Sequence, residues 1–405
     1  MSFSVNRRRL LAGSASLAFA ATIPTWASAA TRDPRLIVIL LRGGLDGLAT
    51  VAPVGDPDFE RQRGGLALKI SGDRPALPLD SLFALNPAMP TFKTLYDAKQ
   101  ALFVQAVCIP YRDRSHFDGQ DVLESGQPAP GRVNDGWLNR FLASLPGRGD
   151  RASGEGLSIA PTTPLIMRGA APVLGWWPQN IGPASDDLVN RLMDLYGQRD
   201  AALQKALAES LRVEALARMG GRNGDRQVKG AAALPPAMRQ MVQGAWRLMR
   251  QPEGPRIAAM YFDGWDTHAN EGPSGGRLAQ LLGGLDGALD ELRAGLGDIW
   301  DSTVVVMITE FGRTVRINGT AGADHGVGTV ALLAGGAVKG GRGIYDWPGL
   351  ADSKLYQNRD LAPTTDLRAV LKGILAEHFE APAGLLGTTI FPDSAAVKPI
   401  AGLVA

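Results

Sequence analysis

Five short apolar runs, several of them rich in β-branched residues, constrain the fold of this chain more than any other feature. They occupy residues 36–41, 101–109, 256–262, 303–309 and 330–333. Continuous apolar runs bounded by turn residues are typical of strands buried inside a parallel sheet that helices cover on both faces. The sequence therefore predicts an α/β protein with a mostly parallel central sheet and helices on both faces.

The segments between these runs predict helices. Leucines recur at helical spacing between residues 278 and 296, which indicates a helix with its leucine face on the core. Residues 366–379 predict a second such helix. His378 falls on it, so we interpret His378 as structural or solvated and leave it out of the candidate site.

The length of 405 residues is compatible with one large α/β domain or with two units. We interpret residues 30–405 as a single domain. Within it, residues 147–254 contain long Ala- and Arg-rich stretches and a polar, Gly-rich segment at 220–230. We expect this part to be a helical insertion or cap over the strand ends.

The first 29 residues resemble a twin-arginine signal peptide. Arg7, Arg8 and Arg9 precede a modestly hydrophobic stretch at 10–21, and small residues at 27–29 predict cleavage before Ala30. An uncleaved N-terminal anchor is the alternative. Twin-arginine machinery exports folded proteins, so the expected location is the periplasm or the exterior. The rest of the chain has no apolar run of about 18 residues, so no membrane span is expected in the mature form.

Charge and cysteine content narrow the function classes. The net charge of +2 is nearly balanced and no basic run follows the N-terminal segment, so nucleic acid is not indicated as a partner. The one cysteine, Cys108, excludes an internal disulfide. It lies in an apolar run, and we expect a buried, unreactive thiol.

Three of the four histidines lie in short polar segments that also carry carboxylates: His116, His268 and His325. Imidazole and carboxylate groups together are common ligands of divalent metals. The alternative is that each histidine merely caps a turn or bonds a backbone carbonyl. Because the carboxyl ends of parallel strands lie along one edge of a sheet, we expect these segments to converge there.

Three carboxylates near the same strand ends are further candidate ligands. Asp266 lies two residues before His268, a spacing that lets both face one ion in extended chain. Asp324 is adjacent to His325, so the two either serve different ions or one supports the other. Glu310 follows a wholly apolar strand, where either a cation or Arg313 offsets the cost of burying its charge.

Asp46 and Ser115 each have two interpretations. Asp46 follows the first strand among Gly43, Gly44 and Gly47, and it either binds metal or caps the next helix. Ser115, beside arginines and His116, is either a nucleophile toward phosphate or sulfate esters or a helix N-cap. The order and spacing of a serine-hydrolase triad and the glycine pattern of a dinucleotide site do not occur.

Six segments in the same order resemble the secreted family catalogued as domain of unknown function 1501. They are RGGLDGL at 42–48, RSHF at 114–117, GWDTH at 264–268, TEFGRT at 309–314, DHG at 324–326 and LAPTTD at 361–366. That family is similar to the alkaline phosphatase and sulfatase superfamily of metal-dependent hydrolases. The resemblance implies an alkaline-phosphatase-like sandwich over nearly the whole mature chain.

The resemblance also implies roles for individual residues. The implied metal ligands are Asp46, Asp266, His268, Glu310, Asp324 and His325. The implied catalytic residues are Ser115, His116 and Arg313, and the arginines that would bind an anionic group are Arg42, Arg112 and Arg313. The sequence departs from the superfamily at Phe311, where hydrolases commonly have histidine, and in the shorter spacing of Asp266 and His268. One or two metal ions are therefore compatible with it.

Two functions are compatible with these observations. The first is an exported metal-dependent hydrolase of phosphate or sulfate esters, in which Ser115 or a metal-bound hydroxide attacks the ester. The second is a non-catalytic accessory protein that keeps the metal site and acts with an exported partner. Ligation by Asp, Glu and His without thiolate favours zinc or manganese, with calcium and magnesium still open.

Overall fold

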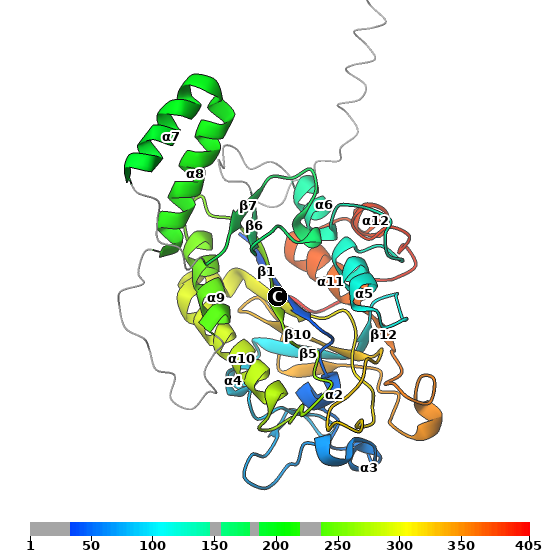
Figure 1. The fold of residues 1–405 in the computed structure, drawn as a ribbon. Helices are drawn as coiled ribbons and strands as arrows, with labels where there is room; N and C mark the ends of the chain where they lie inside the picture. Colours follow the sequence, from blue (N-terminus) through cyan, green and yellow to red (C-terminus); the bar gives the residue numbers. More distant parts are fainter. Residues whose placement is uncertain (1–32, 146–154, 179–185, 219–235) are drawn as a thin grey trace, which may run out of the picture.

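A nine-stranded sheet forms the centre of the molecule in a computed structural model that describes residues 33–145, 155–178, 186–218 and 236–405 (Figure 1). Its strand order is β11-β5-β10-β9-β1-β8-β6-β7, and β12 pairs with β5. The strands are β1 (Arg35–Arg42), β5 (Ala101–Cys108), β6 (Gly156–Ile159), β7 (Val173–Trp176), β8 (Ile257–Asp263), β9 (Thr303–Ile308), β10 (Thr329–Ala334), β11 (Arg342–Ile344) and β12 (Thr365–Asp366).

The five predicted strands are confirmed as β1, β5, β8, β9 and β10. β1 lies between β8 and β9 and is parallel to both. β10 runs the other way, antiparallel to both β9 and β5. The mostly parallel sheet is therefore confirmed, and it contains one reversed strand near its middle.

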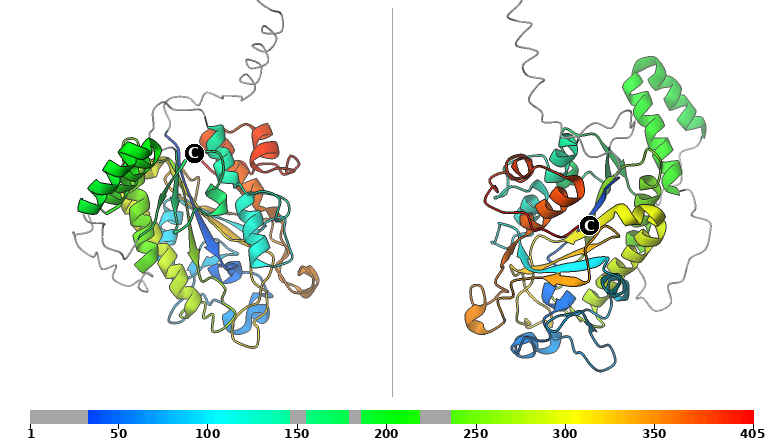
Figure 2. Two further views of the ribbon diagram at one scale, coloured as in Figure 1. Left: turned by 45° about the horizontal axis from the view of Figure 1, so that its top comes forward. Right: turned by 180° about the vertical axis from the view of Figure 1, so that it is seen from behind.

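Helices cover both faces of the sheet, as the sequence predicted (Figure 2). Successive side chains of a strand point to opposite faces. Ile37, Ile39 and Leu41 of β1 belong to a core cluster with α4 (Pro90–Asp97), α9 (Pro236–Met249) and α10 (Arg277–Leu296). The alternate residues of β1 belong to a second cluster with α5 (His116–Ser125), α6 (Trp137–Ser144) and α11 (Leu367–Phe379).

The two predicted amphipathic helices are α10 and α11. Asp366 caps α11 by accepting a hydrogen bond from the Arg368 backbone N–H. His378 lies buried near the end of α11, and its Nε2 is 3.0 Å from the carbonyl oxygen of Arg35. Arg35 begins β1, so His378 lies at the edge of the sheet opposite to the candidate site, in agreement with its predicted structural role.

The stretch at 147–254 contains strands as well as helices. β6 and β7 extend the sheet beyond β8, and with four residues each they are too short to show a clear periodicity. The helical part comprises α7 (Asp186–Arg199), α8 (Ala201–Arg218) and α9. α7 and α8 form a hairpin that projects from the body, whereas α9 packs on α10 (Figure 1).

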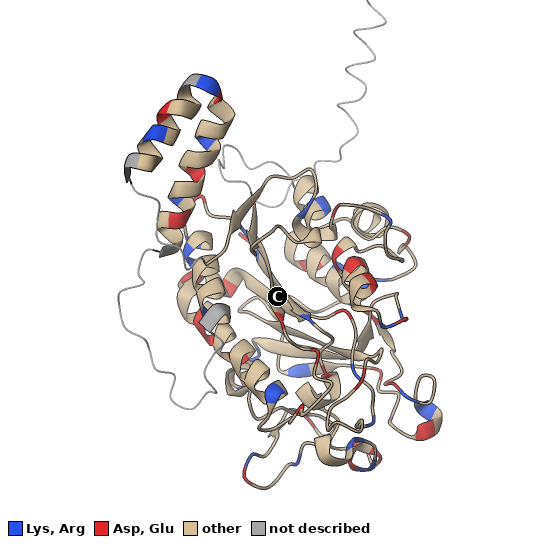
Figure 3. Ribbon diagram, in the orientation of Figure 1, with Lys and Arg blue, Asp and Glu red and all other residues tan. Residues whose placement is uncertain are grey.

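The remaining elements are short. A second sheet has the order β2-β4-β3, formed by β2 (Val51–Ala52), β3 (Leu77–Pro78) and β4 (Ala84–Leu85). The short helices are α2 (Gly47–Thr50), α3 (Phe59–Arg63) and α12 (Ala383–Leu385). Charged residues lie mainly on helices and loops, while the central strands contain few of them (Figure 3).

Cys108 is buried as expected, and burial raises the pKa of its thiol to about 11. Among the described residues, no helix is long and apolar enough to cross a membrane. The predicted signal peptide at 1–29 and the glycine-rich segment at 220–230 lie outside the described residues.

Candidate metal centre

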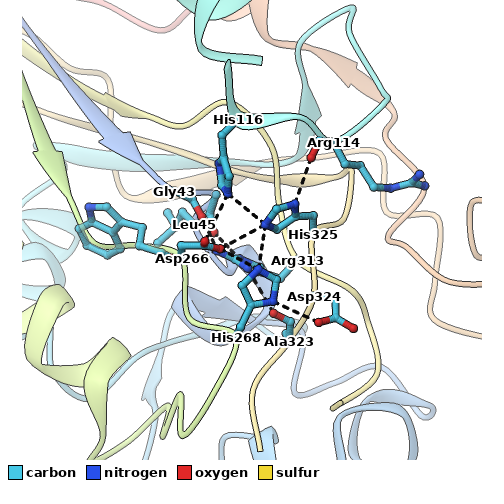
Figure 4. A network of polar contacts seen from close by, with 12 residues as sticks. Gly43, Leu45, Arg114, His116, Asp266, His268, Arg313, Ala323, Asp324 and His325 are labelled. Carbon is cyan, nitrogen blue, oxygen red and sulfur yellow. Dashed lines mark hydrogen bonds and ion pairs between the residues drawn. The ribbon is translucent and has the colours of Figure 1, made fainter. Parts of the chain in front are cut away.

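Polar loops from four strands meet at one edge of the sheet (Figure 4). His116 begins α5 after β5, Asp266 follows β8, and Glu310 follows β9. His325 precedes β10 instead of following it. Because β10 is antiparallel to its neighbours, its amino end lies at the edge where β5, β8 and β9 end, and His325 arrives beside the other residues.

Ligand atoms of His116, Asp266 and His325 all lie within 4.8 Å of one another. The Nε2 atoms of His116 and His325 are 3.0 Å apart. Asp266 Oδ1 is 3.2 Å from His325 Nε2, and Asp266 Oδ2 is 3.5 Å from His116 Nε2. These three residues, from three distant segments of the chain, are the centre of the site.

His268 joins the same group from the other side. Its Nε2 lies 2.9 Å from His325 Nε2 and 3.0 Å from Asp266 Oδ1. Three imidazoles and one carboxylate thus present their donor atoms to a common region (Figure 4). All four side chains are 24–43% exposed, so the region is reachable from solvent.

The Nδ1 atom of each of these imidazoles is held by an acceptor outside the centre. The three contacts are His116 Nδ1 to Glu310 Oε1 at 2.9 Å, His268 Nδ1 to Asp324 Oδ1 at 3.1 Å, and His325 Nδ1 to the Arg114 carbonyl oxygen at 3.0 Å. A carbonyl or carboxylate oxygen can only accept, so each Nδ1 carries the proton. In the neutral rings, every Nε2 then presents a lone pair toward the centre.

This arrangement fits a divalent metal ion. Two lone pairs about 3 Å apart repel each other unless a cation or a proton lies between them. In tetrahedral coordination with bonds of about 2.1 Å, neighbouring ligand atoms lie about 3.4 Å apart. The donor separations of 3.0–3.5 Å among His116, His325 and Asp266 are close to that value. These three residues could therefore hold the ion, and His268 Nε2 lies within 3.0 Å of His325 and Asp266 as a further ligand candidate.

Arg313 holds the carboxylate of Asp266 in place. Its side chain is fully buried, and Nη2 donates to Asp266 Oδ1 at 2.5 Å. The guanidinium also donates to backbone carbonyls, from Nε to Gly44 at 2.7 Å and from Nη2 to Trp265 at 3.0 Å. Burial acts to raise the pKa of Asp266, but the hydrogen bond and charge of Arg313 outweigh it and lower the pKa. Asp266 is thus kept ionised.

Glu310 is fully buried and supports His116. Its Oε1 accepts from the Gly43 backbone N–H at 2.8 Å and from Gln120 Nε2 at 3.2 Å, besides its contact with His116. Thr309 Oγ1 donates to Oε2 at 3.0 Å. Burial favours a raised pKa for Glu310, but these donors, His116 first, hold the pKa below its usual value. The negative charge of Glu310 is therefore used to orient His116.

A family model matches the part of the sequence that contains the residues of the metal centre. Residues 98–386, well over half of the chain, match the family model described as "Protein of unknown function (DUF1501)". The chain belongs to the DUF1501 family. No curated protein matches this DUF1501 chain.

Solved structures resemble it more distantly. Murine ectonucleotide pyrophosphatase/phosphodiesterase 5, in an inactive form in complex with AMP, is 11% identical with a TM-score of 0.28, over 69% of this chain and 57% of that chain. This DUF1501 chain therefore spans less than two thirds of that protein. Phosphonate monoester hydrolase of Agrobacterium radiobacter is 12% identical with a TM-score of 0.35, over 90% of this chain and 78% of that chain.

A third structure, the lipoteichoic acid synthase LtaP from Listeria monocytogenes, is 10% identical with a TM-score of 0.35. That match covers 90% of this chain and 76% of LtaP. All three scores lie below 0.5, so residue roles in the DUF1501 chain are inferred from its own geometry.

In the DUF1501 chain, the carboxylate of Asp46 binds partners other than the three histidines. Asp46 is buried and caps α2, with Oδ1 accepting from the Ala49 N–H at 3.0 Å. Its Oδ2 forms an ion pair with the buried Arg63. Glu271 lies fully buried beside this pair. Burial, followed by the negative charge of Asp46, raises the pKa of Glu271 to about 9, so the Glu271 carboxyl is protonated at neutral pH.

Asp324 lies at the outer side of the site and contacts His268 Nδ1. Its Oδ1 also accepts from Asn318 Nδ2 at 3.0 Å. The hydrogen bond from Asn318, more than the one from His268, lowers the pKa of Asp324. Asp324 and Glu310 therefore have matching positions, each behind one imidazole.

Ser115 caps α5, with its Oγ accepting from the Asp118 N–H at 3.5 Å. The arginines that the resemblance linked to an anionic group are already engaged. Arg313 binds Asp266, Arg42 forms an ion pair with the buried Glu124, and Arg112 lies over the Tyr356 ring at 5.6 Å.

Sequence reasoning missed four groups that shape the site: Gln120 behind Glu310, Asn318 behind Asp324, the Arg114 carbonyl behind His325, and Glu271 beside Asp46. A backbone carbonyl leaves no signal in a sequence. The other three lie in polar segments where nothing separates them from ordinary surface residues.

Proposed function

We propose that this protein is an exported, metal-dependent hydrolase of phosphate or sulfate esters. One observation carries the proposal: the Nε2 atoms of three imidazoles and the carboxylate of Asp266 converge at a solvent-accessible sheet edge, with each Nδ1 held from outside. Polar contacts behind metal ligands of this kind orient the ligands and increase metal affinity.

The residues of the chain have separable tasks in this proposal. A divalent ion in such a site supplies Lewis acidity to an ester oxygen and lowers the pKa of bound water. Glu310 and the Arg114 carbonyl fix the orientation of His116 and His325. Arg313 keeps Asp266 ionised and in place. The site is thereby organised before substrate binds, which lowers the cost of rearrangement during the reaction.

The types of ligand atoms indicate which metal the site would bind. Three imidazoles and a carboxylate, without thiolate, suit zinc and manganese better than calcium, which takes six to eight oxygen ligands. We propose one ion at the centre. Asp46 already forms an ion pair with the buried Arg63, which favours one ion over two.

A binding function is the second candidate. The observation that favours it is the engagement of Arg42, Arg112 and Arg313 in internal contacts. An anionic ester would have to compete with Glu124 or Asp266 for these guanidinium groups. An accessory protein that uses the metal site to act with an exported partner requires no such competition.

Metal analysis combined with a substrate screen tests the proposal. Protein purified from the periplasmic fraction is assayed for bound zinc, manganese, calcium and magnesium, and then with aryl phosphate, phosphodiester and sulfate esters. We expect about one transition-metal ion per chain and turnover of one ester class, both lost in His325→Gln. Bound metal without turnover of any ester would favour the binding function, and absence of metal would contradict both.

Export is tested separately through the N-terminal arginines. Replacement of Arg7, Arg8 and Arg9 by lysine preserves the charge and removes the paired arginines. We expect this variant to remain in the cytoplasm while the unaltered chain reaches the periplasm. Equal export of both forms would contradict the twin-arginine route.

A further inference from the structure

A cleft beside the candidate metal centre has no role in the function proposed so far. It has a volume of roughly 400 Å³, within the usual range for small-molecule sites. Its lining comes from β1, α5, β8 and the loop after β6: Arg42, Phe117, Gln120, Asp121, Tyr261 and Arg168 contribute, with Glu124 behind Arg42. Among the described residues, the polar contacts of the metal centre do not include Phe117, Tyr261 or Arg168.

Two observations place the cleft next to the candidate metal centre. Phe117 directly follows His116 at the start of α5. Gln120 lines the cleft and also donates to Glu310, which holds His116. A molecule bound at the centre through an anionic ester group would therefore extend its organic part into this cleft.

The charges of the cleft are balanced. Arg42 and Arg168 carry two positive charges, and Asp121 and Glu124 carry two negative ones. Arg42 is further held by Glu124, which is 3% exposed, and lies 3.9 Å from the Tyr261 ring centroid. An ion pair of this kind leaves no net charge for a second anion. The cleft therefore suits an uncharged group that offers both hydrogen-bond donors and acceptors.

Phe117 adds an apolar face to this polar lining. Its side chain is 89% exposed, an unusual position for a large aromatic residue that has no described partner covering it. The negative face of an aromatic ring attracts the polarised C–H groups of a sugar ring, and the alternating donors and acceptors match sugar hydroxyls.

We propose that this cleft binds an uncharged sugar ring, so that the substrate is a phosphate or sulfate ester of a carbohydrate. The substrate class rests on the proposed hydrolase function, while sugar binding itself does not. Phe117 stacks on the ring, and Arg42, Asp121 and Arg168 contact its hydroxyl groups. None of these residues belongs to the metal ligand set.

The test measures binding of methyl glycosides of glucose, galactose and N-acetylglucosamine by saturation-transfer NMR and calorimetry. Phe117→Ala removes the exposed ring without disturbing the core, and Ile70→Ala, at a residue 67% exposed and outside the cleft lining, is the matched control. We expect the unaltered protein and Ile70→Ala to bind at least one glycoside. In Phe117→Ala the affinity should fall at least about tenfold.

Absence of binding by all three glycosides overturns the proposal, and so does equal binding by Phe117→Ala. Tighter binding of phenol than of every glycoside also overturns it, because the cleft would then be an aryl site. Turnover is scored separately. Glycoside binding without hydrolysis of any ester contradicts the proposed hydrolase function and supports sugar binding in the cleft. Hydrolysis of simple esters without glycoside binding supports the hydrolase function and contradicts sugar binding in the cleft.

Discussion

The Nε2 atoms of His116 and His325 lie 3.0 Å apart, although the Nδ1 atoms of both rings are committed to acceptors outside the centre. Neutral rings in this arrangement would place two lone pairs against each other. A proton can relieve the contact: the hydrogen bond with Glu310 raises the pKa of His116, whereas burial and the nearby His116 lower that of His325. A divalent ion would relieve the contact for all three imidazoles together.

The first prediction separates the two classes of histidine in this chain. His325→Gln removes a central imidazole, and we expect bound metal to fall to background. His378→Gln is the control, because His378 is buried near Arg35 at the opposite edge of the sheet. It should retain metal and lose about 1–3 kcal/mol of unfolding free energy. Elemental analysis and chemical denaturation give the two readouts.

Loss of metal from both histidine variants in equal measure would show that the assay reports unfolding and not ligand removal. Retention of metal by His325→Gln would remove His325 from the ligand set.

The second prediction concerns the charge of Asp266. Asp266→Asn keeps the shape of the side chain but removes the anion that Arg313 holds in place. Metal affinity should fall at least about tenfold, since a neutral amide is a poorer ligand than a carboxylate. The buried Arg313 keeps its carbonyl acceptors, so the metal-free variant should unfold at nearly the temperature of the metal-free parent.

Asp73→Asn, at an exposed aspartate outside the site, is the matched control and should bind metal normally. Unchanged metal affinity in Asp266→Asn would show that the role assigned to Asp266 is wrong.

The third prediction is a pH dependence that arises from Glu271. Its pKa rises from 4.5 to about 9 on folding, so the folded chain holds a proton that the unfolded chain releases. The resulting contribution to stability is complete below about pH 4.5 and is lost as the pH rises toward 9. The unfolding free energy should fall in this window by up to about 1.4 kcal/mol per pH unit.

Glu271→Gln replaces the protonated acid with an uncharged side chain of similar shape. Denaturation of metal-free protein at pH 6, 7.5 and 9 should give a flatter profile for this variant than for the parent. Glu60→Gln, at an exposed glutamate, is the control and should follow the parent. Parallel profiles for Glu271→Gln and the parent would contradict a protonated Glu271.

The fourth prediction separates the two interpretations of Ser115. As the N-cap of α5, Ser115 should cost about 1 kcal/mol of stability when replaced by alanine and little when replaced by asparagine. We expect Ser115→Asn to keep turnover, because the Ser115 hydroxyl is directed to the Asp118 N–H. Complete loss of turnover in a stable, metal-loaded Ser115→Asn would instead support Ser115 as the nucleophile.

The sequence predicted the central sheet because its strands are long, apolar and uninterrupted. β1 and β9 are buried along almost their entire length, which leaves a clear pattern. The direction of β10 was not predictable, since an apolar run of six residues reads the same in either orientation. β6 and β7 were missed because four residues carry too little periodicity.

The sequence also singled out the central residues of the site, and their coordination of a metal stays a prediction. His116, Asp266, His268 and His325 were recognisable because histidine is rare in this chain and carboxylates accompany it. Asp46 resembled these candidate ligands in sequence, but it forms an ion pair with Arg63 of α3. No local sequence pattern predicts that contact.

The reversed strand has a consequence for biosynthesis. His116 and His268 precede His325 in the chain, and His325 reaches the centre only when β10 lies between β5 and β9. A nascent chain that ends before this strand lacks part of the donor set. The proposed metal would therefore be loaded only into an almost finished polypeptide, and the compartment in which folding ends would decide which metals compete for the site.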